Sequence, residues 1–491
     1  MKKLLLSILM LLPMMASADA VKIDGLWYYL ISESKEAEVT KNPSDYDGPS
    51  DYSGEVVIPE NVTYDGVEYK VTNIGVRAFV GCTDLTSVTI PSSVRSIGAV
   101  AFGSCSSLKS LIIPNSVKEI GNSAFCECNV LSSITIPNSL TTLGDNLFSG
   151  CTGLPSVVVP NSVTSIGSGT FFRCKGLSSV TIPNSVTTIG DWAFQECNSL
   201  TSISIPNSVT KIGLSAFREC TSLVSIDIPN SVIEIGSSIF QDCTSLASVS
   251  ISNGLTCISD RAFWGCTALT SVTIPEDVTY VGDRAFHGCT SITSVKLPNS
   301  LTSIWAGAFM DCSGLKKIII PSNVTDIESR AFSGCTELTD VYCAAIKVPY
   351  ASDDAFHFPP YITLHVLASY IDTYKAAPSP WNIFKEIVEW DGITTEKEKC
   401  AKPTINIAYG KVSFFCETED VEFVYEITKS GSGKEVGLSN KYQIKVYATK
   451  ENWVDSEIAT AEVEIKSGDA NGDGVVNAAD IVQIVNIIMG K

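Results

Sequence analysis

A 23-residue repeat constrains the fold of this chain more than any other feature of its sequence. Phenylalanine recurs at every twenty-third position, and a cysteine follows each phenylalanine three positions later. A fixed period between 20 and 50 residues indicates stacked coils, each of which buries its apolar face on the next coil. The twelve phenylalanines are Phe79, Phe102, Phe125, Phe148, Phe171, Phe194, Phe217, Phe240, Phe263, Phe286, Phe309 and Phe332.

One coil is expected to contain a strand, a turn and a compact bend. In residues 177–197 the apolar spacing over 177–182 predicts a short strand, which Pro183 ends because proline lacks the amide that a ladder needs. Gly190 follows an inward isoleucine and is predicted to supply a turn that prefers a positive φ. The Ala-Phe-x-x-Cys segment that ends at Cys197 is predicted to form a tight helical turn.

A single coil of this kind cannot be stable by itself. Ordering its backbone costs ~1–2 kcal/mol per residue, whereas each buried apolar side chain returns only ~1.5–3 kcal/mol. The coils must therefore stack, so that each fills the open core of its neighbour. At a strand spacing of ~4.7–4.9 Å, twelve coils would give a rod roughly 55 Å long.

The repeat Leu-x-x-Val-x-Ile-Pro-x-x-Val-x-x-Ile-Gly-x-x-Ala-Phe-x-x-Cys resembles the 23-residue leucine-rich repeats of BspA-like bacterial surface proteins. The resemblance covers residues 55 to about 390, with Val56 to Pro59 as the first strand. It implies a mainly β solenoid of parallel strands with short helical turns over 55–338, between an N-terminal cap (21–54) and a C-terminal cap (339–390). It also implies a non-catalytic protein that binds a protein or glycan on a host, matrix or neighbouring cell surface, as in adhesion.

The first 20 residues have the pattern of a secretory signal peptide. Lys2 and Lys3 precede an apolar run from Leu4 to Met15, and either Ala16-Ser-Ala18 or Ala18-Asp-Ala20 supplies the cleavage site. No later apolar stretch is long enough to span a bilayer. We therefore expect an exported protein, secreted or at the cell surface, without a membrane span.

Charge and histidine content narrow the function classes. The chain has 53 acidic and 34 basic residues, a formal net charge of −19, which argues against nucleic acid as a partner. Its three histidines, His287, His357 and His365, have neither nucleophile nor metal-ligand spacing. The paired carboxylates of Asp353 and Asp354 are expected to be solvated. No catalytic residue is predicted.

The 17 cysteines do not indicate a disulfide framework. Equivalent cysteines of adjacent coils would lie ~5 Å apart with parallel Cα–Cβ bonds, whereas a disulfide needs Cβ atoms ~3.8 Å apart. We expect the twelve repeated cysteines to be buried thiols that act as small apolar groups. Cys126, Cys257, Cys343, Cys400 and Cys416 lie outside this series. Both a Cys400–Cys416 disulfide and free thiols remain open.

The sequence changes character after a linker at 391–399. Four alternating segments, 404–415, 421–427, 441–448 and 458–465, predict a small β-sandwich over 400–466. It resembles the immunoglobulin-like modules appended to many exported bacterial proteins, which implies a spacer.

A calcium loop is predicted in the last segment, 467–491. Calcium prefers six to eight oxygen ligands, and a 12-residue loop supplies them from positions 1, 3, 5, 7, 9 and 12, with glycine at position 6. Gly474 stands at position 6. The ligands would be Asp469, Asn471, Asp473, the Val475 carbonyl, Asn477 and Asp480.

Asp480 and the apolar helix predicted after it resemble one dockerin repeat, although dockerins carry two such loops. This resemblance implies a cohesin-like partner. Three alternatives remain open: a calcium staple that orders the tail, docking to a partner module, or an empty vestige. The helix from Ile481 to Met489 is almost wholly apolar and must bury itself against something.

Two ligand surfaces are predicted on the solenoid. Outward strand positions mostly carry serine or threonine, such as Thr89 and Thr273, but large side chains replace them near the C-terminal coils. This first candidate patch comprises Lys296, Lys316, Lys317, Ile319 and Tyr342. The second is a row that directly follows the phenylalanines, at Phe172, Trp264, His287 and Met310. Ordinary packing of neighbouring coils is the alternative explanation for both.

Two functions compete. The first is macromolecular binding or adhesion through the solenoid surface. The second is a calcium-dependent, dockerin-type component of an extracellular assembly, linked to polysaccharide degradation. Deletion of 467–491 would abolish only the second.

Overall fold

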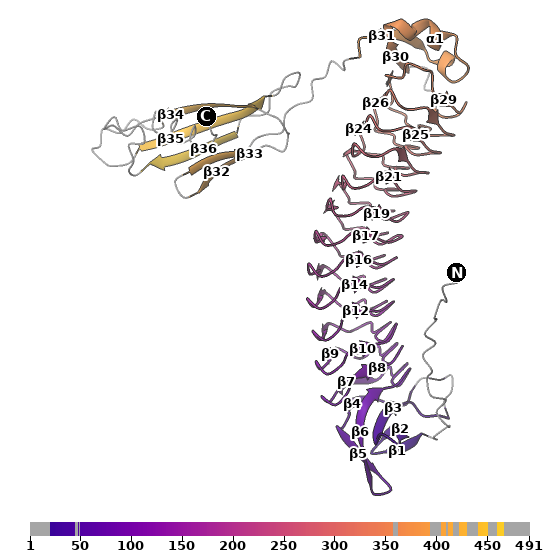
Figure 1. Ribbon diagram of the computed structural model, residues 1–491, viewed down its shortest axis with the longest axis vertical. Helices are drawn as coiled ribbons and strands as arrows, with labels where there is room; N and C mark the ends of the chain where they lie inside the picture. Colours follow the sequence, from indigo (N-terminus) through magenta and orange to yellow (C-terminus); the bar gives the residue numbers. More distant parts are fainter. Residues whose placement is uncertain are drawn as a thin grey trace, which may run out of the picture. The chain divides into compact units, whose positions relative to one another are not determined.

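The computed structural model describes residues 20–44, 48, 50–356 and 362–392, and five strands between 404 and 465. The chain divides into two compact units, 1–392 and 393–491. In the first unit, coils stack one on another between two closed ends (Figure 1). The signal peptide predicted at 1–20 lies outside the described residues except for Ala20, and His357, Cys400 and Cys416 also lie outside them.

The N-terminal end is a small sheet that joins the first coils. Strands β1 to β3 are antiparallel neighbours, β3 pairs in parallel with β6, and β5 and β6 form a hairpin. The Tyr52 ring lies 4.9 Å from the Phe79 ring and covers the first coil. The strands are β1 (Val21–Ile23), β2 (Leu26–Ile31), β3 (Glu36–Thr40), β5 (Asn61–Tyr64) and β6 (Val67–Ile74).

The predicted strand recurs along one side of the solenoid in every coil except at 201–206, and these strands form an interrupted parallel ladder made of several short sheets. The expectations at 56–59 and 177–182 are confirmed, since β4 pairs with β7 and Ser179 lies in register with Ser156. We call the outward surface of this ladder the serine face. Its strands are β4 (Gly54–Val57), β7 (Leu85–Thr89), β9 (Ser110–Ile112), β11 (Ser133–Thr135), β13 (Ser156–Val158), β15 (Ser179–Thr181), β18 (Ser225–Asp227), β20 (Ser248–Ser250), β22 (Ser271–Thr273), β24 (Ser294–Lys296), β26 (Lys317–Ile320) and β28 (Asp340–Cys343).

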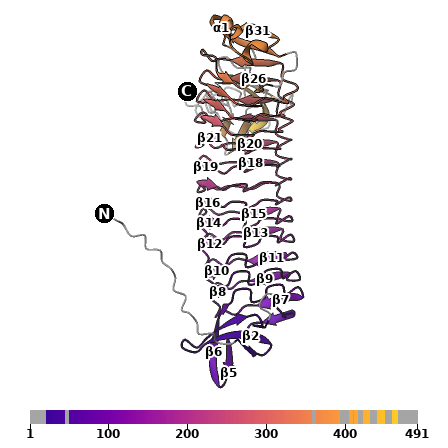
Figure 2. The same ribbon diagram turned by 90° about the vertical axis from the view of Figure 1, so that its right-hand side faces the viewer.

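A second ladder, which the sequence did not predict, runs along another side of the solenoid (Figure 2). Each coil contributes two residues to it, and Ile189, for example, lies in register with Ile212. It begins from β6. Its strands are β8 (Ser96–Ile97), β10 (Glu119–Ile120), β12 (Thr142–Leu143), β14 (Ser165–Ile166), β16 (Thr188–Ile189), β17 (Lys211–Ile212), β19 (Glu234–Ile235), β21 (Cys257–Ile258), β23 (Tyr280–Val281), β25 (Ser303–Ile304), β27 (Asp326–Ile327) and β29 (Tyr350–Ala351).

The phenylalanines form a column of stacked rings in the core. All twelve are buried, and the centroids of successive rings lie 5.0 to 5.7 Å apart. The bend around each ring is a tight turn rather than a helix. In one example, the Cys197 amide donates a hydrogen bond to the Phe194 carbonyl, three residues back. The predicted short helical turns are therefore absent from the described coils.

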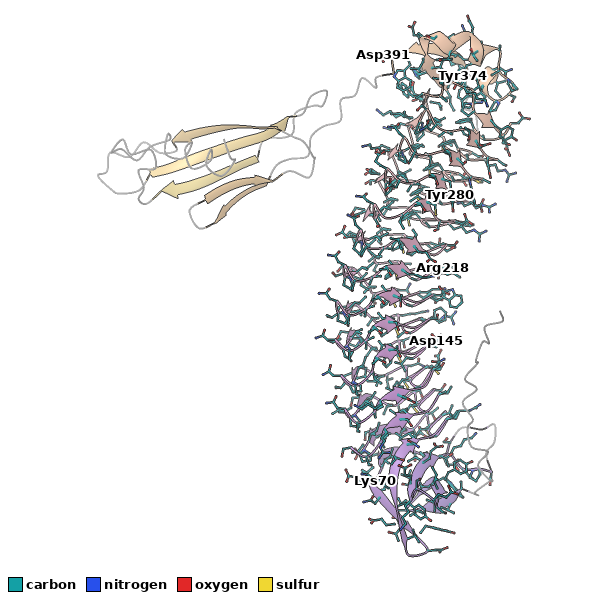
Figure 3. All side chains as sticks on the ribbon, viewed as in Figure 1. Lys70, Asp145, Arg218, Tyr280, Tyr374 and Asp391 are labelled. Carbon is teal, nitrogen blue, oxygen red and sulfur yellow. The ribbon has the colours of Figure 1, made fainter. Side chains whose placement is uncertain are left out.

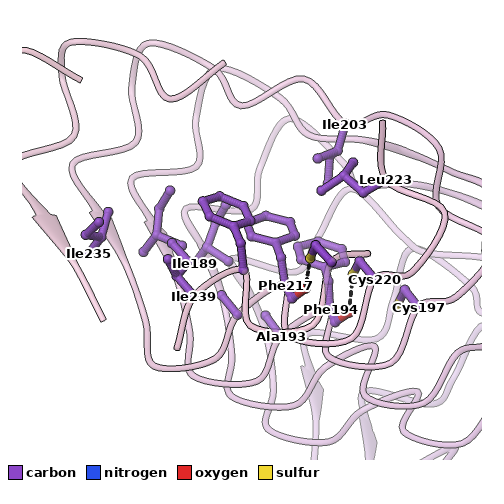
Figure 4. Close-up of a cluster of buried hydrophobic side chains, with 14 of the residues drawn as sticks. Ile189, Ala193, Phe194, Cys197, Ile203, Phe217, Cys220, Leu223, Ile235 and Ile239 are labelled. Atoms are coloured by element: carbon purple, nitrogen blue, oxygen red, sulfur yellow. Dashed lines mark hydrogen bonds between the residues drawn. The ribbon is translucent and has the colours of Figure 1, made fainter. Parts of the chain in front are cut away.

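The prediction that the repeated cysteines are buried thiols is confirmed. They also do more than fill space. The Cys220 sulfur donates a hydrogen bond to the carbonyl of Phe194 in the preceding coil, at 3.1 Å (Figure 4), and the equivalent bond recurs from Cys105 to Cys335. Burial raises the pKa of the Cys220 thiol to about 12.

The role predicted for the repeated glycine is wrong. The φ angle of Gly190 is not positive; the positive φ values fall two and six residues later, at Trp192 and Glu196. A Cβ atom on Gly190 would lie 2.7 Å from the backbone of Gly167 and Ser168 in the preceding coil. The position is glycine because adjacent coils approach too closely there for a side chain.

The C-terminal end closes the stack with aromatic side chains. The Phe356 ring lies 5.2 Å from Phe332, and Trp381 and Phe384 contact Phe356 edge-on. Strands β30 and β31 continue the ladder of the serine face. No helix among the described residues is long and apolar enough to cross a membrane. The elements are β30 (Thr363–Leu367), η1 (Ala368–Tyr370), α1 (Ile371–Lys375), η2 (Trp381–Ile383) and β31 (Glu386–Trp390).

The second unit contains five described strands. A hairpin, β32–β33, accounts for the first predicted segment, and β34–β35–β36 form an antiparallel sheet. The β-sandwich and the immunoglobulin-like character of this unit remain predictions. The strands are β32 (Thr404–Ala408), β33 (Lys411–Phe415), β34 (Glu422–Lys429), β35 (Asn440–Thr449) and β36 (Ala459–Ile465).

Candidate ligand surfaces

The register of the serine face aligns outward side chains in columns. Within β15, Val180 is buried while Ser179 and Thr181 are exposed. Parallel pairing repeats this pattern from coil to coil, so one column holds the serines and another holds the positions equivalent to Thr181. Small hydroxyl groups therefore cover most of this face. A hollow of about 270 Å³ interrupts it between residues 202–205 and 225–227, where residues 201–206 form no strand.

The first predicted patch lies where this pattern ends. Lys296, Ile319 and Tyr342 share the column of Thr181, and the same register brings His365 and Val388 into line with them. Lys296 is exposed, whereas Ile319 and Tyr342 are half-buried. The structure therefore unites three of the predicted residues in one column and adds a histidine that the sequence analysis did not assign to the patch.

The aromatic part of this patch is fixed by its neighbours. The Tyr342 and His365 rings stack at 4.2 Å with an interplanar angle of 12°, and Trp390 meets Tyr342 edge-on at 5.3 Å. The His365 Nε2 atom lies 2.7 Å from the Asp340 carboxylate. These contacts hold the rings in one orientation, as a preformed binding surface requires.

The two adjacent lysines complete the patch. Lys316 is exposed and precedes β26, and Lys317 lies in register with Asp340 on β28. We call Lys296, Lys316, Lys317, Ile319, Tyr342 and His365 together the C-terminal patch.

The second predicted surface is only partly assembled. Trp264 and His287 lie on adjacent coils with ring centroids 4.9 Å apart, and the Arg261 guanidinium covers Trp264 at 5.4 Å. Phe172 lies four coils away, where Arg173 covers its ring at 4.8 Å. All four predicted residues of this row are half-buried. The described ring contacts of Phe172, Trp264 and His287 are with their own and adjacent turns, and a ligand role for this row remains a prediction.

Side chains cover the first unit along its whole length, and Tyr280 lies in its C-terminal part (Figure 3). Trp305 stacks on Tyr280 at 4.6 Å, whereas Trp192 is 43% exposed. Neither contacts the residues of the predicted row through a described aromatic pair.

The paired carboxylates line a hollow at the C-terminal end. It has a volume of about 440 Å³ and lies beside Tyr350 and Trp381. Asp354 accepts hydrogen bonds from the hydroxyls of Ser352 and Ser329, and these bonds, led by that from Ser352, lower its pKa. Asp353 is exposed, as predicted for a solvated carboxylate.

The predicted calcium ligands lie outside the described residues. They are Asp469, Asn471, Asp473, Val475, Asn477 and Asp480. The calcium site therefore remains a prediction from the spacing of these residues.

Comparisons with known proteins identify relatives of the solenoid. A family model described as the BspA type leucine-rich repeat region matches residues 60–177, 165–291 and 257–373. A leucine-rich repeat protein from Bacteroides ovatus is 32% identical, with a TM-score of 0.50; the match covers 66% of this chain and 94% of that protein. A leucine-rich cell surface protein from Faecalibacterium prausnitzii is 29% identical, with a TM-score of 0.43, over 67% of this chain and 96% of that one. Curated proteins gave no match.

Proposed function

Because the chain belongs to the BspA-type leucine-rich repeat family, we propose that it is an exported, non-catalytic protein that binds a macromolecular ligand through its serine face. Proteins of this type are typically found at the cell surface. The signal-like first 20 residues support export. The ligand would be a protein or a glycan on a host, matrix or neighbouring cell surface.

One observation carries this proposal: the serine face ends in the C-terminal patch. Over most of the face, small hydroxyl groups offer hydrogen bonds but little area for a tight contact. At the patch, a stacked tyrosine and exposed lysines stand in the same positions. Binding energy usually concentrates in a few such large, well-held side chains. Exposed Lys296 and Lys316 favour a ligand that carries acidic groups.

The proposal is tested by replacing two lysines of the patch with threonine, a small side chain of the kind that other coils carry at these positions. A Lys296→Thr, Lys316→Thr double variant leaves the Tyr342–His365 stack intact, and Thr273→Ala, one coil earlier, is the control. Labelled full-length protein is applied to arrays of matrix proteins and of acidic and neutral glycans. We expect the double variant to lose about tenfold or more in affinity for any ligand that the parent binds. Equal binding by the double variant and the control would contradict the role of the patch.

The calcium loop favours a second function, a calcium-dependent component of an extracellular assembly. All six ligand positions of the loop carry suitable residues, and the apolar helix predicted after it needs a partner surface. Under this proposal, deletion of 467–491 abolishes capture of a cohesin-like partner. Under the first proposal, that deletion leaves ligand binding by the solenoid unchanged.

Limited proteolysis tests the calcium loop directly. Calcium should slow cleavage within 467–491, and a chelator should reverse the effect, because the ion orders the loop. A variant with Asp469→Ala and Asp473→Ala should be cleaved rapidly with or without calcium. If the parent chain is cleaved at the same rate with calcium and with chelator, the loop does not bind calcium in the way proposed.

A further inference from the structure

The two ladders of the solenoid end differently at the C-terminal end. The ladder of the serine face continues beyond β28 through β30 and β31. The second ladder stops at β29, which pairs with β27 alone among the described strands (Figure 1). One edge of β29 therefore has no neighbouring strand in the described part of the chain.

The backbone of Ala351 faces this open edge. The Tyr350 amide donates a hydrogen bond to the Thr325 carbonyl at 2.9 Å. The Ser352 amide donates one to the Ile327 carbonyl at 3.0 Å, so both donors face the preceding coil. Backbone groups alternate in direction along a parallel strand, which turns the amide and carbonyl of Ala351 the other way. No described residue bonds to either group, and such an edge is a template for another extended chain.

The hollow of about 440 Å³ lies on this open side of β29. Its lining includes Ala351 and residues 378–381, but no residue of β27. The buried Trp381 side chain forms a fixed wall, because its Nε1 atom donates a hydrogen bond to the Pro349 carbonyl at 2.8 Å. The Tyr350 side chain, which also lines the hollow, is 66% exposed. The volume falls within the range of ligand sites, ~300–1,000 Å³.

The hollow presents negative charge to a ligand. Asp353 and Asp354 line it and are both exposed. Two serine hydroxyls donate to Asp354 and hold it in place. The Arg330 Nε atom lies 3.6 Å from Asp354, although Arg330 is not a lining residue. Asp353 forms no ion pair with a described residue, so its charge is available to a cationic partner.

We propose that this hollow binds an extended peptide segment that carries a lysine or arginine and adds to the open edge of β29. The peptide backbone would bond to the amide and carbonyl of Ala351, in the place that a following coil takes elsewhere in the ladder. The basic side chain would pair with Asp353, beside the exposed ring of Tyr350. Backbone bonds supply affinity in this mode, and the side chain supplies specificity.

The combination of backbone and charge favours a peptide over a saccharide. A neutral saccharide would use the Tyr350 ring and the serine hydroxyls, but it would leave the charge of Asp353 without a partner. An extended basic peptide satisfies Ala351 and Asp353 together. The site is distinct from the C-terminal patch, whose lysines favour an acidic ligand, so the chain would offer contacts to two kinds of partner.

The first test measures peptide binding. Labelled pentapeptides of valine and threonine, with one arginine at each position in turn, are titrated with the full chain at about 150 mM salt, which screens nonspecific attraction to an acidic protein. Fluorescence anisotropy should detect at least one binding peptide, and glutamate in place of its arginine should weaken binding about tenfold or more. No binding at protein concentrations up to about 500 µM would overturn the proposal.

The second test asks whether the peptide binds as a strand. The amide nitrogens on one edge of the binding peptide are methylated, and those on the other edge are methylated in a second peptide. Methylation of one edge should abolish binding and methylation of the other should not, because only one edge can pair with β29. Equal tolerance of both modifications would refute addition to the strand.

The third test locates the contact. Asp353→Lys should weaken binding of the arginine peptide about tenfold or more and should restore binding of the glutamate peptide. Asp277→Lys is the matched control, because Asp277 is also exposed but does not line the hollow. Equal effects of the two variants would place the peptide elsewhere and overturn the proposal; circular dichroism verifies that both fold.

A saccharide is the competing outcome. If no peptide binds, but a neutral glycan binds and Tyr350→Ala abolishes that binding, the hollow is a saccharide site and the proposal is wrong. These outcomes do not depend on ligand binding by the C-terminal patch, which the Lys296→Thr, Lys316→Thr variant tests separately.

Discussion

Replacing Phe217 by alanine should lower the free energy of unfolding of the solenoid by about 5 kcal/mol. The ring is fully buried, and its centroid lies 5.3 Å from that of Phe194 and 5.6 Å from that of Phe240. Truncation of a buried phenylalanine costs ~3–5 kcal/mol through lost burial and the cavity left behind. Each lost aromatic pair is worth ~0.5–1.5 kcal/mol beyond the area that it buries, which places Phe217 at the upper end of that range.

Urea denaturation followed by circular dichroism measures this loss. The matched control is Phe172→Ala, which removes the same atoms one position further along a turn. Phe172 is half-buried and its described ring contact is with the Arg173 guanidinium, so its loss should cost about 1–2 kcal/mol. Since each coil contacts only its neighbours, a defect at Phe217 should also uncouple the two halves and broaden the transition.

The loss in free energy of unfolding should be larger for Phe217→Ala than for Phe172→Ala. If both cost the same, or if Phe217→Ala costs less than about 2 kcal/mol, the ring column does not hold the coils together. The stacking argument would then be wrong, whatever the strand ladders contribute.

Three further predictions concern residues inside the solenoid. Burial raises the pKa of Cys220 to about 12, above that of an unfolded thiol, so the contribution of this thiol to stability should be complete below about pH 8.5 and be lost as pH rises toward 12. In urea denaturation at several pH values, the free energy of unfolding of Cys220→Ser should fall less steeply over this range than that of the parent chain, and equal slopes would count against the linkage. Cys220→Ala should melt below Cys220→Ser, by about 1 kcal/mol in stability, because serine can still donate to the Phe194 carbonyl; the reverse order would show that the bond is unimportant. Gly190→Ala should cost about 1–3 kcal/mol in thermal unfolding, because its Cβ meets the backbone of Gly167; a neutral effect would contradict the close approach of the coils.

The core of the solenoid was predictable because its signal is repeated twelve times. One Phe and one Cys recur in every coil, and both sets of side chains are buried, which confirms the prediction made for the cysteines. The second ladder was not predictable by alternation, since each coil contributes only two residues to it, as at Thr188–Ile189. Gly190 shows a different limit. Glycine indicates either a positive φ or a lack of space, and only the position of the neighbouring backbone distinguishes the two.

The candidate site shows where the repeat signal becomes weak. His365 was not assigned to the patch because the Phe-x-x-Cys signature ends at Cys335. The outward spacing nevertheless continues, since Tyr342, His365 and Val388 are each 23 residues apart and lie in register. Counting from the strand positions, instead of from the phenylalanines, would have found it. The contact of Trp390 with Tyr342 had no such signal, because Trp390 approaches that ring edge-on from β31.

The way in which the two ends are closed makes the length of the solenoid adjustable. Tyr52 covers Phe79 at one end and Phe356 covers Phe332 at the other, so neither closing residue depends on how many rings lie between them. Whole 23-residue units can therefore be gained or lost without rebuilding either terminus. Each unit would shift the lysines and tyrosine near the C-terminal end by ~4.8 Å relative to the N-terminal end. The length of the solenoid is thus set by the number of its coils, which a single in-frame duplication can change.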